Sequence, residues 1–479
     1  MLEIILVSIL AIFAALSAFA VALTVVGSVQ VSSKVREGIL QYLFVGLLLS
    51  NGLAFLVAGK LGDPSSVEMA TPGPSALASW IIRFNSIFVI IACLDQFFRY
   101  VRGNPVIDWR RLLLIAGVVC MFCGNVISPA LFGKNPVSIE SSWFYGPMLG
   151  VGIMCLSQAA AQNAVLVGRN ALVVFTVLSL ALIPILPASM LQLDYSEGFL
   201  PGVPRFTGLA PHAIMMGMLC SIALWCMIVH PFSSVKIHRF SLAACLLALF
   251  LAQSKTVWFS FILSLPVLYF FRVDWNHWKR KRFGDYKLVF VLGCLAVAFV
   301  MLTALALLIT GFAEERASAF SRSSAGHQVL SLTGRDVIWR HAIEEWKTSP
   351  LTGYGLPLFN EEYRARIRHA GATSGHNQFI DALGRAGGIG AVTMAVYYCI
   401  LSWFGFRYSR ATNGLSTVLT LSMLVRSISE LPIRIFSLGI GETPHLLLLI
   451  LIVVGLWQDK KSDRRVKAFA QSRHTVSVT

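Results

Sequence analysis

The chain has 479 residues, of which 56% are hydrophobic and only 13% are charged; its mean hydropathy is +0.72 and its net charge is +16. So little charge cannot cover the surface of a soluble protein of this length, which excludes a soluble globular enzyme. The apolar residues fall in long runs, and a helix needs about 20 of them to cross a bilayer. The composition therefore predicts an all-α polytopic membrane protein.

Thirteen apolar runs predict about 12–13 transmembrane helices. They span residues 4–30, 38–59, 76–98, 111–132, 143–166, 170–192, 209–230, 239–253, 256–272, 287–312, 386–405, 413–431 and 438–457. The eighth and ninth runs are short and are separated only by Ser254-Lys255-Thr256. This pair forms either a tight hairpin or one broken helix.

Basic residues concentrate in alternate connections between these runs. They include Lys34, Arg36, Arg99, Arg102, Arg110, Arg111, Arg169, Lys236, Arg239, the segment 272–287, Arg407, Arg410 and the tail from Lys460 to Lys467. The positive-inside rule makes these connections cytoplasmic. The positive charge thus reflects topology and anionic membrane lipid rather than a nucleic-acid partner.

The same rule divides the chain into four parts. We expect N-terminal transmembrane helices at 1–312, a periplasmic loop at 313–385, C-terminal transmembrane helices at 386–458 and a basic cytoplasmic tail at 459–479. Loops as long as the second part are usually functional or disordered. This one is rich in aromatic residues, which predicts a folded, helical loop.

Two helices are predicted within that loop. The first follows Thr333-Gly334-Arg335-Asp336, which resembles a capping box, and it ends before Ser349-Pro350. Arg335 would lie in its first turn, where free N–H groups already favour an anion. The second opens at Thr373-Ser374-Gly375-His376-Asn377, with His376, Phe379, Ile380 and Leu383 on one side; Gly387-Gly388-Ile389-Gly390 leads into the next span.

Two further cations are predicted at the same face of the membrane. Arg205 precedes the seventh span, and Lys255 occupies the turn between the eighth and ninth. The topology rule therefore places Arg205, Lys255, Arg335 and His376 on one side. Three cations beside one imidazole suit a pyrophosphate-bearing substrate and a hydroxyl group that must be deprotonated.

Each of these residues also has a purely structural interpretation. Arg205 and Lys255 could be interfacial anchors whose charged ends reach the lipid headgroups. His376 could be a hydrogen-bonding cap at the start of its helix.

Ion pairing offers a second structural interpretation. Arg335 could pair with Asp336 or Glu344 on its own helix. Arg426 and Glu430, four positions apart on the twelfth span, are interpreted as a structural ion pair.

The motifs around these residues resemble a known family. Leu332-Thr333-Gly334-Arg335-Asp336-Val337-Ile338-Trp339, Pro350-Leu351-Thr352-Gly353-Tyr354-Gly355 and Gly375-His376-Asn377, with Gly384 and Gly387-Gly388-Ile389-Gly390, resemble the O-antigen ligase and Wzy-type polymerase superfamily. Arg205-Phe206-Thr207-Gly208 and Gln253-Ser254-Lys255-Thr256 resemble its two shorter upstream motifs. The second of these usually carries Arg where this chain has Lys255, which keeps the charge but loses bidentate geometry.

The resemblance implies a GT-C-like membrane glycosyltransferase in the bacterial inner membrane, with its active site on the periplasmic side. Its donor would be a glycan on undecaprenyl pyrophosphate, and its chemistry would be inverting and independent of metal or other cofactors. Arg205, Lys255 and Arg335 would hold the pyrophosphate, Asn377 would contact substrate, and His376 would be the general base. The sequence contains no D-x-D motif, which agrees with chemistry that uses cations instead of a metal.

The acceptor distinguishes the activities within this superfamily. A polymerase extends another lipid-linked repeat unit, whereas a ligase transfers the glycan to lipid A-core or, in some relatives, to protein. The motif at residues 332–339 looks more like that of exopolysaccharide polymerases, which favours polymerisation of O-antigen or exopolysaccharide repeat units. Such a polymerase could have a chain-length regulator or an export protein as a further partner. A lipid-linked-sugar flippase is the alternative from another class, but a transporter would place its ionisable groups near the membrane midplane.

Overall fold

The structure is a computed structural model that describes residues 37–58, 75–103, 108–193, 202–272, 335–369, 372–433 and 438–476. In this part of the chain it is helical apart from a short antiparallel ribbon, β1 (Leu191–Gln192) with β2 (Arg205–Phe206). Six described helices are long and apolar enough to cross a membrane. The predicted all-α polytopic fold is confirmed. The predicted helices 4–30 and 287–312 lie outside the described residues, so the total of 12–13 stays a prediction.

The first three described spans match the predicted runs closely. They are η1 (Ile39–Tyr42) continuing into α2 (Leu43–Ala58), then α3 (Ala76–Arg102), then α4 (Trp109–Phe122) continuing through the π-helical turn η2 (Cys123–Ile127) into α5 (Ser128–Phe132). Local caps explain where two of them begin. Ser75 accepts a hydrogen bond from the N–H of Ala78, and Asp108 accepts one from the N–H of Arg110.

The predicted division between 143–166 and 170–192 is wrong. The structure has η3 (Ser141–Phe144), a short α6 (Tyr145–Met154), a long α7 (Gln158–Ala181) and a single turn, α8 (Pro187–Met190). The break falls at 155–157, where the Ser157 hydroxyl caps α7 by accepting from the N–H of Ala160 at 3.0 Å. The break between the two predicted helices therefore falls earlier in the chain than hydropathy suggested, which leaves a short first helix and a long second one.

Arg169 is the cause of the error, because its charge suggested a loop. It lies instead in the middle of α7, where its guanidinium donates hydrogen bonds to the carbonyl groups of His230 and Pro231. The guanidinium also lies 4.0 Å from the centre of the Phe232 ring. A charged residue with such partners can stay within a helix, and these partners come from a segment about sixty positions away.

The second half of the bundle follows the predicted order. Its elements are α9 (Ala213–Val229), α10 (Val235–Leu251), α11 (Lys255–Arg272), α16 (Arg335–Thr348), α17 (Glu361–Arg366), α18 (Gln378–Arg407), α19 (Leu415–Ser427), η5 (Ile440–Glu442) and α20 (Thr443–Val476). Of the two alternatives for the eighth and ninth runs, the hairpin is confirmed. Val257 lies beside Gly217, and Phe261 stacks on Trp225, so α11 runs parallel to α9. It is therefore antiparallel to α10, the helix that precedes it.

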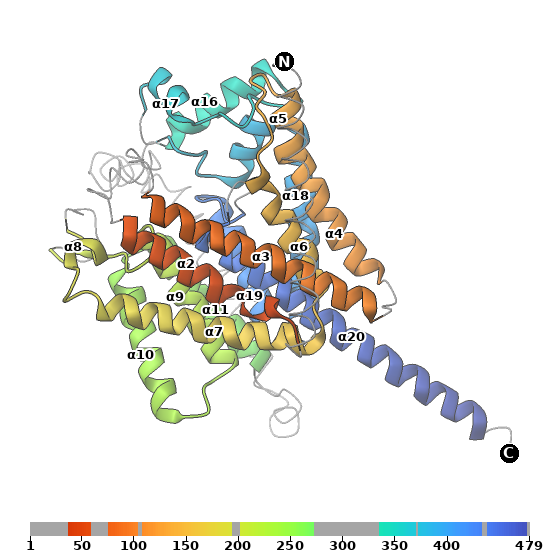
Figure 1. The fold of residues 1–479 in the computed structure, drawn as a ribbon. Coiled ribbons are helices and arrows are strands. Elements are labelled where there is room, and N and C mark those ends of the chain that lie inside the picture. Colours follow the sequence, from red (N-terminus) through yellow and green to blue (C-terminus); the bar gives the residue numbers. More distant parts are fainter. Residues whose placement is uncertain are drawn as a thin grey trace, which may run out of the picture.

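The helix α20 is the centre of the bundle. Within its apolar window, 94% of the residues are buried, compared with 28% for α3. It packs against α6, α7, α18 and α19, and its last turns extend away from the other helices (Figure 1). The predicted basic tail is thus a helical continuation of the last span through Val476.

The bundle has two chemically different ends. We call the end that carries α16 and α17 the loop end, and the opposite end, where α20 leaves the bundle, the basic end (Figure 1). At the basic end, Asp459 lies 3.2 Å from both Arg110 and Arg407, which belong to two different predicted cytoplasmic connections. This clustering is what the positive-inside prediction requires, although which end faces the cytoplasm stays a prediction.

Candidate active site

The loop end has a small hydrophobic core of its own. Ile338 and Ala342 of α16 pack with Leu358, Tyr363 and neighbouring apolar residues. Burial raises the pKa of the Tyr363 phenol to about 12, with a further contribution from Glu345, so the phenol stays neutral in this core. The predicted first helix, from Arg335 to just before Ser349, is confirmed. This helix packs on a hydrophobic core formed by the residues that follow it.

A backbone exchange joins this core to α18. In an unbroken helix the N–H groups of Gly388 and Ile389 would bind the carbonyls of Gly384 and Arg385. They bind Pro350 and Leu351 instead, at 2.8 and 3.1 Å, while Gly384 and Arg385 accept from Tyr354 and Gly355 at 2.9 Å. The helix breaks at Gly387, with φ of +65°. The Gly-rich motifs therefore exist to let residues 350–355 pair with α18.

A clamp joins α16, which carries Arg335, to the loop before α18, which carries His376. The indole N–H of Trp339, one turn after Arg335, donates to the carbonyl of Gly375 at 2.8 Å. The N–H of Gly375 donates to Asp381 at 2.7 Å, and Asp381 also pairs with Arg385 at 3.0 Å. The loop that carries His376 is thus held from both sides.

His376 itself lies just outside the helix, which corrects its predicted place on a helical face with Phe379 and Leu383. Its φ is +45°, a left-handed conformation that turns the chain before α18 begins at Gln378. The interpretation of His376 as the helix cap is also wrong, because Asn377 holds that position. His376 is half-buried.

Asn377 caps the start of α18. Its side-chain oxygen accepts from the N–H groups of Phe379 and Ile380 at 3.0 and 3.1 Å, and its amide nitrogen donates to the carbonyl of Ile428 at 3.1 Å. One amide N–H remains beyond these bonds. The predicted contact of Asn377 with substrate stays a prediction that this N–H would have to serve.

Glu430 is the site residue that the sequence reasoning missed. It was interpreted as a partner of Arg426 on one helix, but α19 ends at Ser427, and the Glu430 carboxylate lies 3.9 Å from the Arg335 guanidinium. Gln378 fixes this segment by exchanging two hydrogen bonds with the backbone of Ile433, at 3.0 and 3.1 Å. The only feature of the sequence that could have indicated Glu430 is its position just after an apolar span at the loop end.

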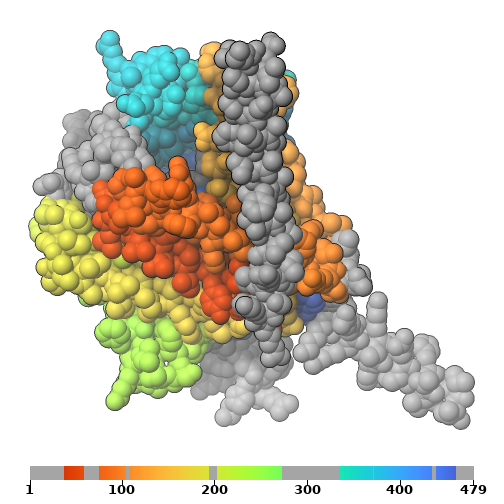
Figure 2. Space-filling model, viewed as in Figure 1, coloured from red at the N-terminus to blue at the C-terminus, as the bar shows by residue number. Residues whose placement is uncertain are grey.

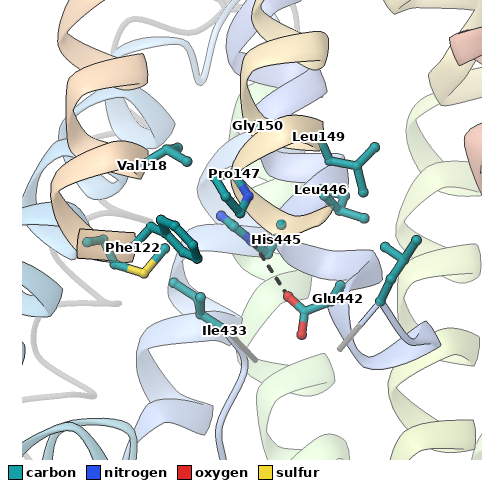
Figure 3. Close-up of a pocket in the computed structure, with 12 residues that line it drawn as sticks. Val118, Phe122, Pro147, Leu149, Gly150, Ile433, Glu442, His445 and Leu446 are labelled. Atoms are coloured by element: carbon teal, nitrogen blue, oxygen red, sulfur yellow. Dashed lines mark ion pairs between the residues drawn. The ribbon is translucent and has the colours of Figure 1, made fainter. Parts of the chain in front are cut away.

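A buried polar network lies behind this segment, in a pocket lined by residues of α4, α6 and the start of α20 (Figure 3). His445 lies 3.7 Å from Glu442, and its Nε2 is 2.6 Å from the hydroxyl of Tyr397 on α18. Ile433 lines the same pocket. These polar contacts join α18 to the start of α20.

Arg205 and Lys255 form a second group. The Arg205 guanidinium donates to the carbonyl of Ala252 at 2.9 Å, and Gln253 donates to the carbonyl of Val203 at 2.9 Å. These bonds tie the strand of Arg205 to the turn that Lys255 follows. The Lys255 side chain is exposed at the first position of α11. The two upstream motifs are therefore neighbours.

Helix packing relates the two groups. A methyl group on Gly414, at the start of α19, would lie 3.5 Å from Leu268 near the end of α11, so these packed helices are antiparallel. Thirteen residues separate Leu268 from Lys255, and thirteen separate Gly414 from Ser427. Both stretches rise about 20 Å at about 1.5 Å per residue. Lys255 and the segment with Glu430 thus lie at the same level, at the loop end.

Comparison with known proteins adds a family to this geometry. Residues 240–395 match the family model described as O-antigen ligase. The match covers about a third of the chain and includes Lys255, Arg335, His376 and Asn377, which confirms the predicted superfamily. Arg205 and Glu430 lie outside the matched residues, and no curated protein matches the chain.

Among the described residues, no group of three or more His, Cys, Asp or Glu side chains gathers as a metal ion would require. The charged groups at the candidate site are mainly cationic instead. Arg205, Lys255 and Arg335 come from a strand and from two helix starts. Such groups can bind an anionic leaving group, and the half-buried imidazole of His376 can accept a proton.

Proposed function

We propose that this chain is a membrane glycosyltransferase that acts on undecaprenyl-pyrophosphate-linked glycans at the periplasmic face and polymerises O-antigen or exopolysaccharide repeat units. The observation that carries this is the clamp through Trp339 and Gly375, which joins the helix of Arg335 to the His376 loop inside the residues that match the O-antigen ligase family. A flippase would have no use for an arginine and a histidine on two segments that are joined outside the apolar spans.

The residues support an inverting displacement at the anomeric carbon. His376 accepts the proton of the acceptor hydroxyl, whose oxygen forms the new bond to that carbon. The bond from the carbon to the phosphate oxygen breaks, and its electron pair remains on the diphosphate. Arg335, Lys255 and Arg205 stabilise this developing charge, so the reaction requires no metal ion.

The acceptor separates two forms of this function. We favour polymerisation because the motif at residues 332–339 resembles that of exopolysaccharide polymerases more than that of ligases. The family description favours ligation, in which the glycan moves to lipid A-core or protein. A polymerase must hold two lipid-linked glycans at once, whereas a ligase needs one such glycan and a different acceptor pocket.

Analysis of the glycans in a deletion strain tests the two forms. Lipid-linked and surface glycans are extracted from a strain that lacks the gene and are then sized by mass spectrometry. Single repeat units without long chains are the expected result. Long chains that remain attached to undecaprenyl pyrophosphate would instead assign the missing step to ligation.

An assay of the purified protein tests the proposed chemistry. The full chain in detergent, supplied with a lipid-linked glycan donor and acceptor, should form product in the presence of EDTA, because the three cations neutralise the leaving group. Activity that disappears in EDTA and returns with Mg²⁺ or Mn²⁺ would show that this mechanism is wrong.

A further inference from the structure

Glu430 introduces a negative charge into a site that should bind an anion. Its carboxylate lies 3.9 Å from the Arg335 guanidinium, and the two side chains are 14% and 23% exposed. Arg335 lies one helical turn before Trp339, whose indole binds the loop that carries His376. The free protein therefore already satisfies this arginine with an internal anion.

The geometry of this pair is that of an exchangeable contact. Charge-assisted hydrogen bonds usually measure about 2.7–2.9 Å between nitrogen and oxygen. Glu345, also on α16, makes such structural pairs with Arg366 at 2.8 Å and Lys134 at 3.1 Å. The separation of 3.9 Å between Arg335 and Glu430 leaves attraction between the charges without a short hydrogen bond to lock them.

Glu430 is held in place independently of Arg335. Asn377 binds the carbonyl of Ile428, and Gln378 binds the backbone of Ile433, on either side of Glu430. The N–H of Glu430 also donates to the carbonyl of Arg426 at 2.7 Å. When the flexible Arg335 side chain turns toward a ligand, the backbone of Glu430 stays where it is.

We propose that Glu430 is a displaceable counter-ion that holds Arg335 in the empty site and yields it to the diphosphate of the donor. This inference rests on the proposed function. Cleavage of the bond between the anomeric carbon and oxygen leaves an additional negative charge on the diphosphate, while the acceptor proton goes to His376. The product would therefore bind the cations more tightly than the donor. Glu430 takes Arg335 back and speeds release, which makes it a positioning residue.

Binding of inorganic pyrophosphate to the purified full chain tests the competition directly. Glu430→Gln removes the competing charge, so calorimetry should show pyrophosphate bound about fivefold more tightly than by the wild type, the size expected for a partly exposed ion pair. Glu345→Gln is the matched control, because it removes a carboxylate of α16 that does not contact Arg335; its pyrophosphate affinity should equal that of the wild type.

A double variant shows whether the effect passes through Arg335. In an Arg335→Gln background, Glu430→Gln should change pyrophosphate affinity no further. Glu430→Asp, which keeps the charge but withdraws it by one methylene group, gives an intermediate affinity and serves if the Gln variant does not fold. Equal affinity of wild type, Glu430→Gln and Glu430→Asp would overturn the proposal, as would tighter binding in the Arg335→Gln background.

Steady-state kinetics adds the release step. Glu430→Gln should lower KM for the lipid-linked donor and also lower kcat, because the product leaves more slowly. Unchanged kcat with a lower KM would refute the role in release. Failure of the wild type to transfer any glycan would contradict the proposed function instead, while the pyrophosphate measurements would still decide whether Glu430 competes for Arg335.

Discussion

At the scale of single residues, His376 has a backbone conformation that constrains how it can be tested. Its φ of +45° favours residues that tolerate the left-handed region, and asparagine does so best among side chains without a base. His376→Asn should therefore fold normally yet lose about 10²–10⁴-fold in transfer rate. His341→Asn is the control, since His341 pairs with Glu344 on the surface of α16. Full activity of the His376 variant would refute the base assignment.

Lys255 should behave as a phosphate-binding cation. It is exposed at the start of α11, where the superfamily usually has Arg, so Lys255→Arg should keep at least the wild-type rate. Lys255→Ala should raise KM for the donor. Lys236, an exposed lysine at the basic end, provides the control, and Lys236→Ala should change nothing. An equal rise in KM in both alanine variants would indicate a general effect of positive charge at the membrane rather than phosphate binding by Lys255.

At the scale of elements, the break in α18 is the feature that connects the loop end to the membrane helices. Gly387 has φ of +65°, and a methyl group there would lie 2.4 Å from the backbone of Leu351. Its ψ of −159° completes a backbone conformation that essentially only glycine adopts, and this conformation costs another residue about 1–3 kcal/mol. Gly387→Ala should therefore lower the midpoint of thermal unfolding in detergent and abolish transfer.

Gly388 gives the matched control for that substitution. A methyl group on Gly388 would approach only the carbonyl oxygen of Pro350, at 3.3 Å, so a small shift can accommodate it. Gly388→Ala should retain most of the thermal stability and activity. If both variants unfold at the wild-type temperature, the backbone exchange between residues 350–355 and α18 does not stabilise the fold.

At the scale of the whole molecule, the two ends of the bundle should face opposite sides of the membrane. Glu361 is exposed at the loop end, and Arg410 is exposed at the basic end. In a cysteine-free background, Glu361→Cys should react with a membrane-impermeant maleimide in spheroplasts, and Arg410→Cys should react only after lysis. Labelling of Arg410→Cys in intact spheroplasts would contradict the predicted topology.

Features that depend only on neighbouring residues could be predicted from the sequence. Hydropathy identified the spans that became α2, α3 and α18, because a helix of about 20 apolar residues is a local property. The capping-box pattern before α16 and Ser349-Pro350 after it placed this helix between Arg335 and Ser349. The motif residues Arg335 and His376 could be selected because helix starts and small-residue turns have local signatures.

Only the tertiary structure decided the features that depend on partners far away in the chain. Arg169 remains in α7 because of carbonyl groups at His230 and Pro231, and no window around Arg169 contains them. The burial of α20 and the pairing of Arg335 with Glu430 arise in the same way. Hydropathy measures how apolar a helix is, but lipid and the protein interior are both apolar, so the sequence could not distinguish a central span from a peripheral one. The sequence also could not identify Glu430 as the anion beside Arg335, because the two residues are far apart in the chain.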